Sequence, residues 1–507
     1  MSVLLTGGVV VTGPGWVPVA ADVLVDGGAI AAVGAPGSLD GGGHGERVDV
    51  SGRLLLPGLV NAHTHSHTLV ARGAARDWTL EDSLLNGGWM SAARGAELAE
   101  LSALLAATEM IASGATGAFD LMAQAGGPDV DGLLAAARGY ARAGLRTVLA
   151  PMVADRSVHE AVPAIGECCG VPPAGSPAAE VVARCAAFAD ALLDEAPLGG
   201  LVTPAVAPTI LAHCTPELVA GLHTVAAERG LRVHTHLAES KPQALAGAER
   251  FGRSITAELD RLGVLDDRLT VAHAIWLSDA DRDLLAAAGA VAVTVPGSNL
   301  RLGSGIADAR ATLAAGVRLA VGTDGANSAD ALDVLDAARL TALLARASTR
   351  PAAEWLTVEE VLTAATEGGA AACGWDRVGR IEPGWAADLA LLDLGSRAFL
   401  PATDLANQAL TAARAADVTD VMVAGRWVYR DRTFPGLDVA AAESRFRELA
   451  EELLAAAAPA RDAAPPWSPR SRHPADAPLP LLEPLPVAAG RVPQADHASH
   501  LTGTSCA

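Results

Sequence analysis

The middle of the chain alternates between short apolar runs and alanine-rich amphipathic segments. Eight of the runs have the composition of β-strands: Leu59–His65, Thr116–Asp120, Arg146–Met152, Gly200–Pro208, Leu231–His236, Leu269–His273, Ala290–Val295 and Val317–Asp324. Parallel strands that are buried on both faces read as continuous apolar runs, and helical segments separate these runs. Eight such units over about 270 residues predict an α/β fold of the (β/α)8, TIM-barrel type, spanning residues 57–379.

Both ends of the chain have a different pattern from the middle. Residues 1–56 contain short runs rich in valine, leucine and glycine, with turn signals between them, and residues 380–435 return to short strands around a glycine turn. We therefore predict a composite β-sandwich domain formed by both chain ends, with the barrel inserted between them. A C-terminal helix over residues 436–458 is expected to follow.

The last segment, residues 459–507, holds ten of the thirty prolines of the chain. Proline at this density is incompatible with helix or sheet interiors, so the segment is predicted to be a disordered or extended tail. The stretch LPLLEP within it is apolar enough to pack on a neighbouring subunit instead.

Composition excludes several classes of protein. Asp plus Glu (58) outnumber Lys plus Arg (37), and the cations are not clustered, which argues against nucleic acid as a partner. Half of the residues are hydrophobic, yet no run approaches the ~18 apolar residues of a membrane span, and the N-terminus has no signal-peptide pattern. Six cysteines without CxxC spacing are typical of thiols in a reducing compartment. The sequence thus predicts a soluble cytoplasmic protein.

Lys241 is the only lysine of the chain. A P-loop nucleotide-binding enzyme needs a lysine in its glycine-rich loop, and a Schiff-base enzyme needs a buried amine. Lys241 does not lie in a glycine-rich loop, so these mechanisms are disfavoured.

Histidines and one aspartate stand where predicted strands end. His63 and His65 end the first strand, and side chains two residues apart on a strand point the same way. His236 ends the fifth strand as part of a second His-x-His, His273 ends the sixth and Asp324 ends the eighth. Any one of these could be a buried core histidine or a helix cap, but together they lie at the barrel end where active sites form. Imidazole and carboxylate suit a divalent ion such as zinc, so we predict a metal site.

The motifs PGLVNAHTH, HLAES, VAHAIW, PGSNLRLGSG and GTDG, in this order, resemble the amidohydrolase superfamily. Within it they are similar to the branch of cytosine, guanine and S-adenosylhomocysteine deaminases and triazine (chloro)hydrolases, and the similarity runs from about residue 1 to 435. The resemblance implies one divalent metal ion, with zinc as the default and Fe²⁺ or Mn²⁺ as alternatives. It assigns the metal to His63, His65, His236 and Asp324. Glu239 would be the proton shuttle, and His273 would hold the attacking water or the substrate.

The residue types also indicate how such a site works. A divalent ion on imidazole and carboxylate ligands lowers the pKa of water toward ~7. Asp324 can take a proton from that water, Glu239 can protonate a ring nitrogen, and His273 can stabilise the developing oxygen charge. Other superfamily members bridge two metals with a carboxylated lysine from the fourth strand, and no lysine lies between His65 and His236. A cysteine or glutamate bridge is not formally excluded, but GLVTPAVAPT offers neither, which favours a mononuclear site.

Four residues are candidates for contact with the substrate. Thr209 follows the proline of the fourth-strand motif, where many relatives carry His or Cys, and His213 either contacts the substrate or starts a helix. Trp78 and Trp89 follow the first strand near the barrel mouth, where an aromatic residue suits a planar ring but packs equally well in a loop. Asn299 is expected to fix a loop rather than to touch the substrate.

The predicted function is a metal-dependent aminohydrolase that deaminates a nitrogen heterocycle of the nucleobase, pterin or triazine type. An alternative keeps the site and changes the leaving group to chloride, an alkylamine or the nitrogen of a cyclic amide. A non-catalytic barrel used for binding is the third possibility, although a scaffold has no need for Glu239 beside the metal ligands. The family resemblance also implies a homo-oligomer, a dimer or larger.

Overall fold

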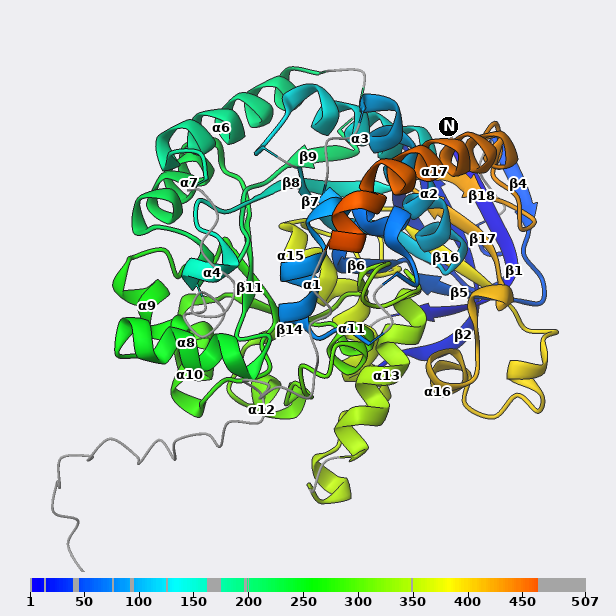
Figure 1. The fold of residues 1–507 in the computed structure, drawn as a ribbon. Coiled ribbons are helices and arrows are strands. Elements are labelled where there is room, and N and C mark those ends of the chain that lie inside the picture. The colour runs from blue at the N-terminus through cyan, green and yellow to red at the C-terminus, as the bar shows by residue number, and fades with distance from the viewer. Residues whose placement is uncertain are drawn as a thin grey trace, which may run out of the picture. The chain divides into compact units, whose positions relative to one another are not determined.

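A ring of parallel strands forms the centre of the computed structural model (Figure 1). The structure describes residues 2–12, 15–39, 45–74, 77–91, 95–124, 126–161, 175–195, 198, 200–347 and 350–463. These belong to the first of two units of the chain, Met1–Trp467. The second unit, Ser468–Ala507, and with it most of the predicted tail, lies outside the described residues.

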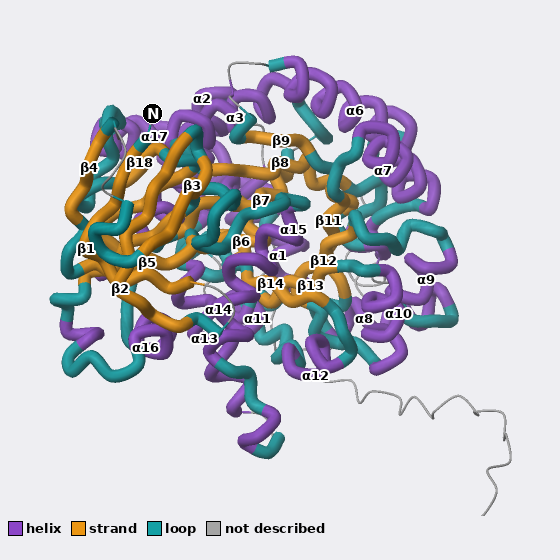
Figure 2. Tube along the Cα trace, turned by 180° about the vertical axis from the view of Figure 1, so that it is seen from behind, coloured by secondary structure: helices purple, strands orange, loops and turns teal. Residues whose placement is uncertain are grey.

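The strands of the ring follow the order of the predicted runs: β6 (Leu59–His65), β7 (Ala115–Ala123), β8 (Arg146–Val153), β9 (Val202–Pro204), β10 (Ala207–Pro208), β11 (Val233–Leu237), β12 (Leu269–His273), β13 (Val291–Thr294), β14 (Arg318–Val321) and β15 (Asp324–Gly325). Neighbouring strands pair in parallel from β6 to β8, β8 pairs with both β9 and β10, and β11 to β14 pair in sequence. Parallel bridges from Val206 and Ile210 to β11 join the two groups, and β15 pairs back to β6. The predicted α/β fold with parallel sheets of the TIM-barrel type is confirmed (Figure 2).

Helices follow the strands and cover the ring from outside, as α6, α7, α9 and α10 show in Figure 1. Every residue of β6, β11 and β12 is buried, so the polar residues of these strands are also enclosed by neighbouring elements. The helices of this region are α2 (Ala96–Ala112), α3 (Val130–Ala143), α4 (Val158–Ala161), α6 (Ala178–Asp194), α7 (Pro216–Arg229), α8 (Lys241–Phe251), α9 (Ile255–Arg261), α10 (Asp279–Ala288), α11 (Pro296–Arg301), α12 (Ala309–Ala314), α13 (Val334–Ala347), α14 (Val358–Thr363) and α15 (Gly369–Cys373).

Local sequence explains where these helices begin and end. In α7 the Thr215 side chain accepts a hydrogen bond from the Leu218 amide, proline occupies the first turn, and Gly230 ends the helix at a φ of 66°. A polar N-cap, proline in the first turn and glycine in the left-handed conformation are favoured at these positions.

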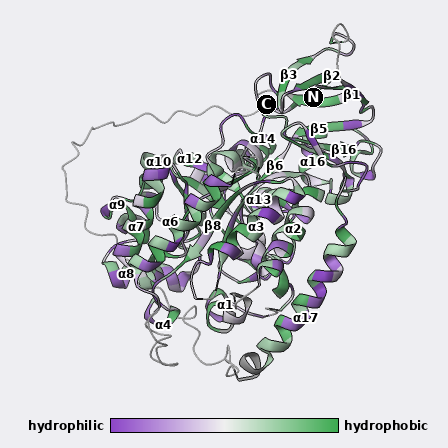
Figure 3. Ribbon diagram, turned by 90° about the horizontal axis from the view of Figure 1, so that it is seen from above, coloured by the Kyte–Doolittle hydropathy of each residue, from purple (hydrophilic) through white to green (hydrophobic). Residues whose placement is uncertain are grey.

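Strands from both ends of the chain lie in one sheet with the order β18-β17-β16-β5-β1-β2-β3, and β4 pairs with β1. The strands are β1 (Val3–Thr12), β2 (Val17–Asp26), β3 (Ala29–Gly34), β4 (Glu46–Asp49), β5 (Arg53–Pro57), β16 (Leu389–Asp393), β17 (Val418–Val423) and β18 (Arg426–Tyr429), with α16 (Leu405–Thr411) between β16 and β17. Their side chains are largely hydrophobic (Figure 3). The joining of the two ends in one sheet is thus observed, whereas their arrangement as a sandwich stays a prediction.

The last described helix, α17 (Val439–Ala463), continues beyond residue 458, where the sequence analysis ended it. It packs on the segment that follows β6: Phe446 and Leu449 lie in one hydrophobic cluster with Trp78 and Trp89. On the outside, Arg445 forms two hydrogen bonds of 2.8 Å with the Glu97 carboxylate. Among the described residues, no helix combines the length and apolar character that crossing a bilayer demands.

Candidate metal centre and active site

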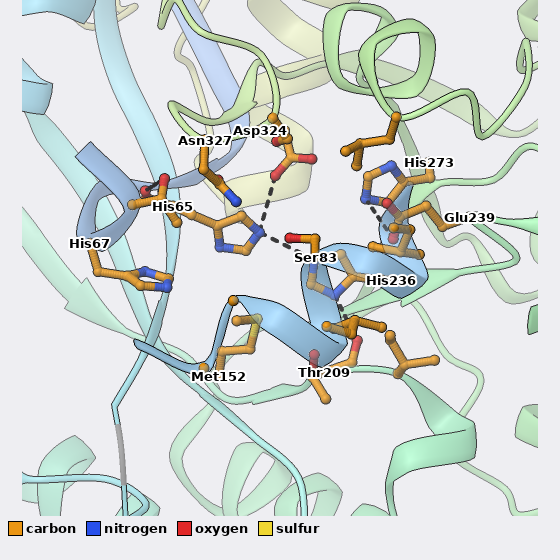
Figure 4. Close-up of a pocket in the computed structure, with 18 residues that line it drawn as sticks. His65, His67, Ser83, Met152, Thr209, His236, Glu239, His273, Asp324 and Asn327 are labelled. Carbon is orange, nitrogen blue, oxygen red and sulfur yellow. Dashed lines mark hydrogen bonds and ion pairs between the residues drawn. The ribbon is translucent and has the colours of Figure 1, made fainter. Parts of the chain in front are cut away.

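Histidine side chains from three strands converge at the carboxyl end of the ring (Figure 4). The ring of His63 lies 4.8 Å from that of His65 and 4.9 Å from that of His236, measured between centroids. The Asp324 carboxylate completes the group, with Oδ1 3.2 Å from His65 Nε2 and 3.6 Å from His63 Nε2. His273, at the end of β12, stacks on His236 with centroids 5.4 Å apart. The structure therefore brings together all five residues that the strand ends suggested.

The outer ring nitrogens fix which nitrogen of each imidazole faces the centre. His65 Nδ1 lies 2.7 Å from the Leu121 carbonyl oxygen, and His236 Nδ1 lies 2.7 Å from the Thr209 carbonyl oxygen. Because a carbonyl oxygen only accepts, each Nδ1 carries the proton and donates it, so that the Nε2 of a neutral ring presents a lone pair. His273 Nδ1 donates in the same way to Asn299 Oδ1 at 2.9 Å. The sequence analysis gave Asn299 only the role of fixing a loop.

His63 has another imidazole as its partner. Its Nδ1 lies 3.2 Å from Nε2 of His234, which is fully buried and meets the edge of Phe119 at 4.5 Å between centroids. Burial, followed by the charges of neighbouring histidines, lowers the pKa of His234 well below its usual value. A neutral His234 accepts the Nδ1 proton of His63 and leaves His63 Nε2 free to bind a metal. The sequence analysis did not select His234, although the second His-x-His motif was visible.

The donor set fits a divalent cation. The hydrogen bonds at the Nδ1 atoms of His65 and His236 make each Nε2 an acceptor. These two acceptor atoms nevertheless lie only 3.3 Å apart. His63 Nε2 is buried and has no hydrogen-bond partner among the described residues. Two overlapping groups, one of His63, His65 and Asp324 and one of His63, His236 and His273, each have ligand atoms within 4.8 Å of one another. Lone pairs converging at such distances repel each other unless a positive charge lies among them.

Electrostatics in this centre favour positive charge. Burial lowers the pKa of His63 to about 4, so its imidazole is neutral at physiological pH. Burial alone would raise the pKa of Asp324, but the neighbouring His63 and His65 rings hold that pKa well below its usual value. Burial opposes charge on His65 too, and yet the contact with Asp324 raises its pKa. A neutral His63 and an ionised Asp324 are protonation states that bind a cation, whereas the raised pKa of His65 means that a metal at its Nε2 competes with a proton.

A second carboxyl group lies beside the centre in the opposite protonation state. Glu239 is 3% exposed, and its Oε2 lies 3.5 Å from His273 Nε2. Burial, followed by the negative charges of Asp324 and Glu81, raises the pKa of Glu239 well above its usual value. This direction favours the protonated form of Glu239, which can donate a proton.

The backbone around these groups is strained. Ala238, His273 and Asp324 have φ angles of 48°, 69° and 71°, in the left-handed region that residues other than glycine seldom adopt. Such conformations persist where surrounding structure holds them, and they cluster at functional sites. In this protein they turn the chain sharply at the strand ends where the polar side chains converge.

A buried network behind β6 holds the segment that follows His65. The Asp120 carboxylate accepts hydrogen bonds from the Ser66 amide at 2.9 Å, the Ser66 hydroxyl at 2.5 Å and the Tyr140 hydroxyl at 2.9 Å. Asp120 lies in β7 and Tyr140 in α3, so the network fixes the turn after His65 from two elements. Sequence reasoning missed it, although an aspartate at the end of the predicted second strand was a signal.

A cavity of about 210 Å³ opens beside the centre. Its wall combines the metal centre with residues from the loops, as follows: His65, His67, Thr68, Leu80, Ser83, Leu84, Gly87, Gly88, Met152, Thr209, Ile210, His236, Glu239, His273, Leu302, Asp324, Asn327 and Ser328. Several of these come from the segment after β6, which includes η1 (Ser66–Ala71), α1 (Leu80–Asn86) and η2 (Gly88–Ser91). The sequence analysis did not select the pocket residues of α1.

Of the four predicted substrate contacts, Thr209 lines this cavity. Trp78 and Trp89 are not among the described residues that line it, because both pack in the cluster with α17. His213 ends η4 (Leu211–His213), is 5% exposed and also lies outside the lining. Contact of these three side chains with the substrate stays a prediction, and the pocket does not support it.

A parallel α/β ring with a histidine and aspartate centre beside a buried acid defines a metal-dependent hydrolase. The chain belongs to the amidohydrolase family, whose family model matches residues 54–428. It is 33% identical over 459 residues to a 5-methylthioadenosine/S-adenosylhomocysteine deaminase of Haloarcula marismortui, covering 90% of this chain and 99% of that protein. A deaminase of the same name from Nitratidesulfovibrio vulgaris is 34% identical over 420 residues, covering 81% and 88%.

Solved structures of similar proteins agree with this placement. An adenosine deaminase of Xanthomonas campestris with bound zinc has a TM-score of 0.79 and 30% identity, covering 89% of this chain and 98% of that one. An atrazine chlorohydrolase of Arthrobacter aurescens complexed with zinc has a TM-score of 0.80 and 25% identity, covering 88% and 100%. The predicted superfamily and branch are confirmed, and so is the class of hydrolase acting on carbon–nitrogen bonds. The histidine and aspartate cluster, together with zinc in both neighbours, supports a single divalent metal such as Zn²⁺.

Proposed function

We propose that this protein is a mononuclear, zinc-dependent aminohydrolase that removes ammonia from an adenine-type heterocycle. The observation that carries the proposal is the buried Glu239, whose Oε2 lies 3.5 Å from His273 Nε2, beside a cluster of imidazoles and the Asp324 carboxylate. Deamination of an amidine-like ring carbon needs an acid that reaches the ring nitrogen and a water that attacks the adjacent carbon. Relatives named as deaminases of 5-methylthioadenosine, S-adenosylhomocysteine and adenosine support the adenine-type ring.

The roles of the residues follow from their geometry. We assign His63, His65, His236 and Asp324 as the metal ligands, and when bound the ion supplies Lewis acidity and an acidified water. Asp324, held ionised, accepts a proton from the attacking water. Glu239 gives its proton to the ring nitrogen, and the proton that Asp324 took from the water then passes to the amino group, which leaves as ammonia. His273, whose Nδ1 donates to Asn299, presents the lone pair of its Nε2 and holds the attacking water by accepting a hydrogen bond from it.

The pocket wall suits a flat, uncharged ring. Leu80, Ile210 and Leu302 supply apolar surface, while Thr209 and Asn327 place polar groups at the edge of the cavity. Pockets of this kind bind through apolar contact and take their orientation from a few polar groups.

A second candidate is hydrolysis of a chlorinated or alkylaminated triazine at the same site. The similarity to the atrazine chlorohydrolase, at a TM-score of 0.80, is the observation that favours it. Both reactions use the same metal and the same acid, and they differ in the leaving group.

The test is a release assay on the zinc-loaded protein with adenosine, 5-methylthioadenosine, S-adenosylhomocysteine, guanine, an aminotriazine and a chlorotriazine. We expect ammonia from an adenine-containing substrate. Glu239→Gln should keep about one zinc per chain and lose about 10²- to 10⁴-fold in turnover. His223→Gln, a change at a half-buried residue of α7 that does not line the pocket, is the control. Chloride without ammonia would favour the second candidate, and full activity of Glu239→Gln would remove Glu239 from the mechanism.

We also propose the domain organisation read from the sequence. Residues 1–56 and 380–435 form one composite β-sandwich, residues 57–379 form the barrel inserted into it, and residues 436–458 add a helix. The single sheet that contains strands from both ends supports this division. A homo-oligomer and a cytoplasmic location stay predictions.

A further inference from the structure

Helix α1 forms one wall of the substrate pocket without belonging to the barrel. Leu80, Ser83 and Leu84 of this helix line the cavity, and Figure 4 shows Ser83 directed toward the metal centre. The helix begins with a capping box in which the side chains of Thr79 and Asp82 bind each other's backbone amides. Because α1 lies in a connection between β6 and α2, its position depends on contacts with neighbouring elements.

One such contact is made by the buried carboxylate of Glu81, which has no role in the proposed mechanism. Glu81 is 5% exposed and does not line the cavity, and its Oε1 accepts a hydrogen bond of 2.5 Å from the Ser240 hydroxyl. Ser240 directly follows Glu239 and caps α8, accepting a hydrogen bond from the Gln243 amide at 3.2 Å. One hydrogen bond therefore connects the pocket wall to the residue next to the proposed acid.

Packing alone gives no reason for a carboxylate at this position. Burying a carboxyl group costs free energy unless hydrogen bonds compensate for the lost water, and an apolar side chain on α1 would avoid that cost. The negative charge of Glu81 also acts on the active site, because it is one of the influences that raise the pKa of Glu239, after burial and the charge of Asp324.

We propose that Glu81 is a positioning residue that fastens α1 to the end of β11 through Ser240, so that closure of the pocket wall and the aim of Glu239 depend on one hydrogen bond. The proposal rests on the proposed role of Glu239. Ala238, which precedes Glu239, has a φ of 48°. The backbone that orients Glu239 is therefore held in an unfavourable conformation, which relaxes when the contacts that hold it are lost. Ser240 lies on the other side of Glu239 and supplies such a restraint.

A double-mutant cycle of Glu81→Ala and Ser240→Ala tests the connection. A hydrogen bond to a charged group contributes enough to change kcat/KM by about tenfold or more. Each single variant should therefore lower kcat/KM by about tenfold, with both a higher KM and a lower kcat. The double variant should lose no more than the worse single variant, because both changes break the same bond. Glu81→Gln keeps an acceptor for the Ser240 hydroxyl and should recover most of the KM effect.

Ser254→Ala is the matched control. Ser254 also caps a helix, α9, and its hydroxyl also donates to a buried carboxylate, that of Asp281, but neither residue lines the pocket. Its loss should leave kcat and KM within about twofold of the unmodified protein, whatever it does to stability, because no pocket contact is lost. A loss of kcat/KM in Ser254→Ala as large as in Ser240→Ala would mean that any broken cap produces the effect, and would overturn the proposal.

Hydrogen exchange of the α1 amides, residues 80–86, separates this proposal from the proposed function. Exchange should be faster in Glu81→Ala and Ser240→Ala and unchanged in Ser254→Ala, with zinc content the same in all. Unchanged exchange in Ser240→Ala, or additive losses in the double variant, would overturn the connection even if Glu81→Ala fails to fold. Faster exchange in a protein that releases ammonia from no substrate would support the connection and contradict the proposed function.

Discussion

His213 is a buried histidine whose effect on stability can be worked out from the structure. It is 5% exposed, and burial alone lowers its pKa from 6.5 to about 4. The folded protein therefore keeps this imidazole neutral down to about pH 4, whereas the unfolded chain protonates it below about pH 6.5. Because the unfolded state binds the extra proton in this window, the free energy of unfolding falls as the pH drops through it and levels off below about pH 4.

The size of the effect follows from the shift. One pKa unit corresponds to about 1.36 kcal/mol, so the complete loss is about 3 kcal/mol, and about 2 kcal/mol of it occurs between pH 8 and pH 5. His213→Leu removes the imidazole. Its free energy of unfolding should therefore fall by about 2 kcal/mol less between pH 8 and pH 5 than that of the unmodified protein. Urea unfolding of both proteins at pH 8 and pH 5 measures the difference, and other titrating groups contribute equally to both.

Leu211→Val, in the same short helix, is the control, since it removes a methylene and should lower stability by about 1 kcal/mol at both pH values. Equal pH dependence in His213→Leu and the unmodified protein would refute the argument from burial. Because His213 lies outside the pocket lining, kcat and KM of His213→Leu should also stay within about twofold, given that no substrate contact is lost. A tenfold rise in KM would instead favour the substrate contact suggested by the sequence.

Three further predictions concern the metal centre and its supports. Removal of the metal with a chelator should lower the free energy of unfolding by about 3 kcal/mol relative to protein with zinc at a hundred times its dissociation constant. Equal melting curves with and without the chelator would contradict a metal centre. His234→Leu should weaken zinc binding by about 10- to 100-fold in competition with a chromophoric chelator, because leucine has no acceptor for the Nδ1 proton of His63, and unchanged affinity would mean that His234 only packs. Tyr140→Phe should destabilise the fold by about 1.5–3 kcal/mol in urea by removing one hydrogen bond to Asp120 while leaving zinc stoichiometry intact, and no loss would show that Ser66 alone suffices.

The sequence predicts the positions of the metal-centre residues well because two simple geometric rules decide them. His63 and His65 share a side of β6 because side chains alternate along a strand, and the carboxyl ends of parallel strands meet at one end of a ring. The predicted limits were less accurate in the fourth and eighth strands. The run Gly200–Pro208 contains two short strands, β9 and β10, each ending in a proline that donates no ladder hydrogen bond. The run Val317–Asp324 breaks at Gly322, where a Cβ would lie 2.8 Å from the His63 amide nitrogen.

The sequence alone could not show which residues of one element contact the site residues of another. Asn299 and His273 both stand out as polar residues in apolar surroundings, but only the placement of α11 against β12 shows that one holds the other. The two tryptophans are the opposite case. Trp78 and Trp89 are of a residue type that could bind a planar ring, but in the structure they pack against α17, the last described helix. Residue type states what a side chain can do, and tertiary contacts decide which of those possibilities is used.

The two carboxyl groups of the site, whose ligand atoms lie within 4.8 Å of each other, show how the same functional group can serve opposite roles. Asp324 and Glu239 are both buried, and burial raises the pKa of each. Asp324 faces two imidazoles, whose contacts outweigh burial and keep it ionised, so it can bind a cation and accept a proton. Glu239 faces the negative charge of Asp324 instead, which adds to burial and keeps it protonated. The charge of Asp324 thus adds to burial in favouring the acid beside it, and a substitution that neutralises Asp324 should remove a proposed metal ligand and weaken this influence on Glu239 together.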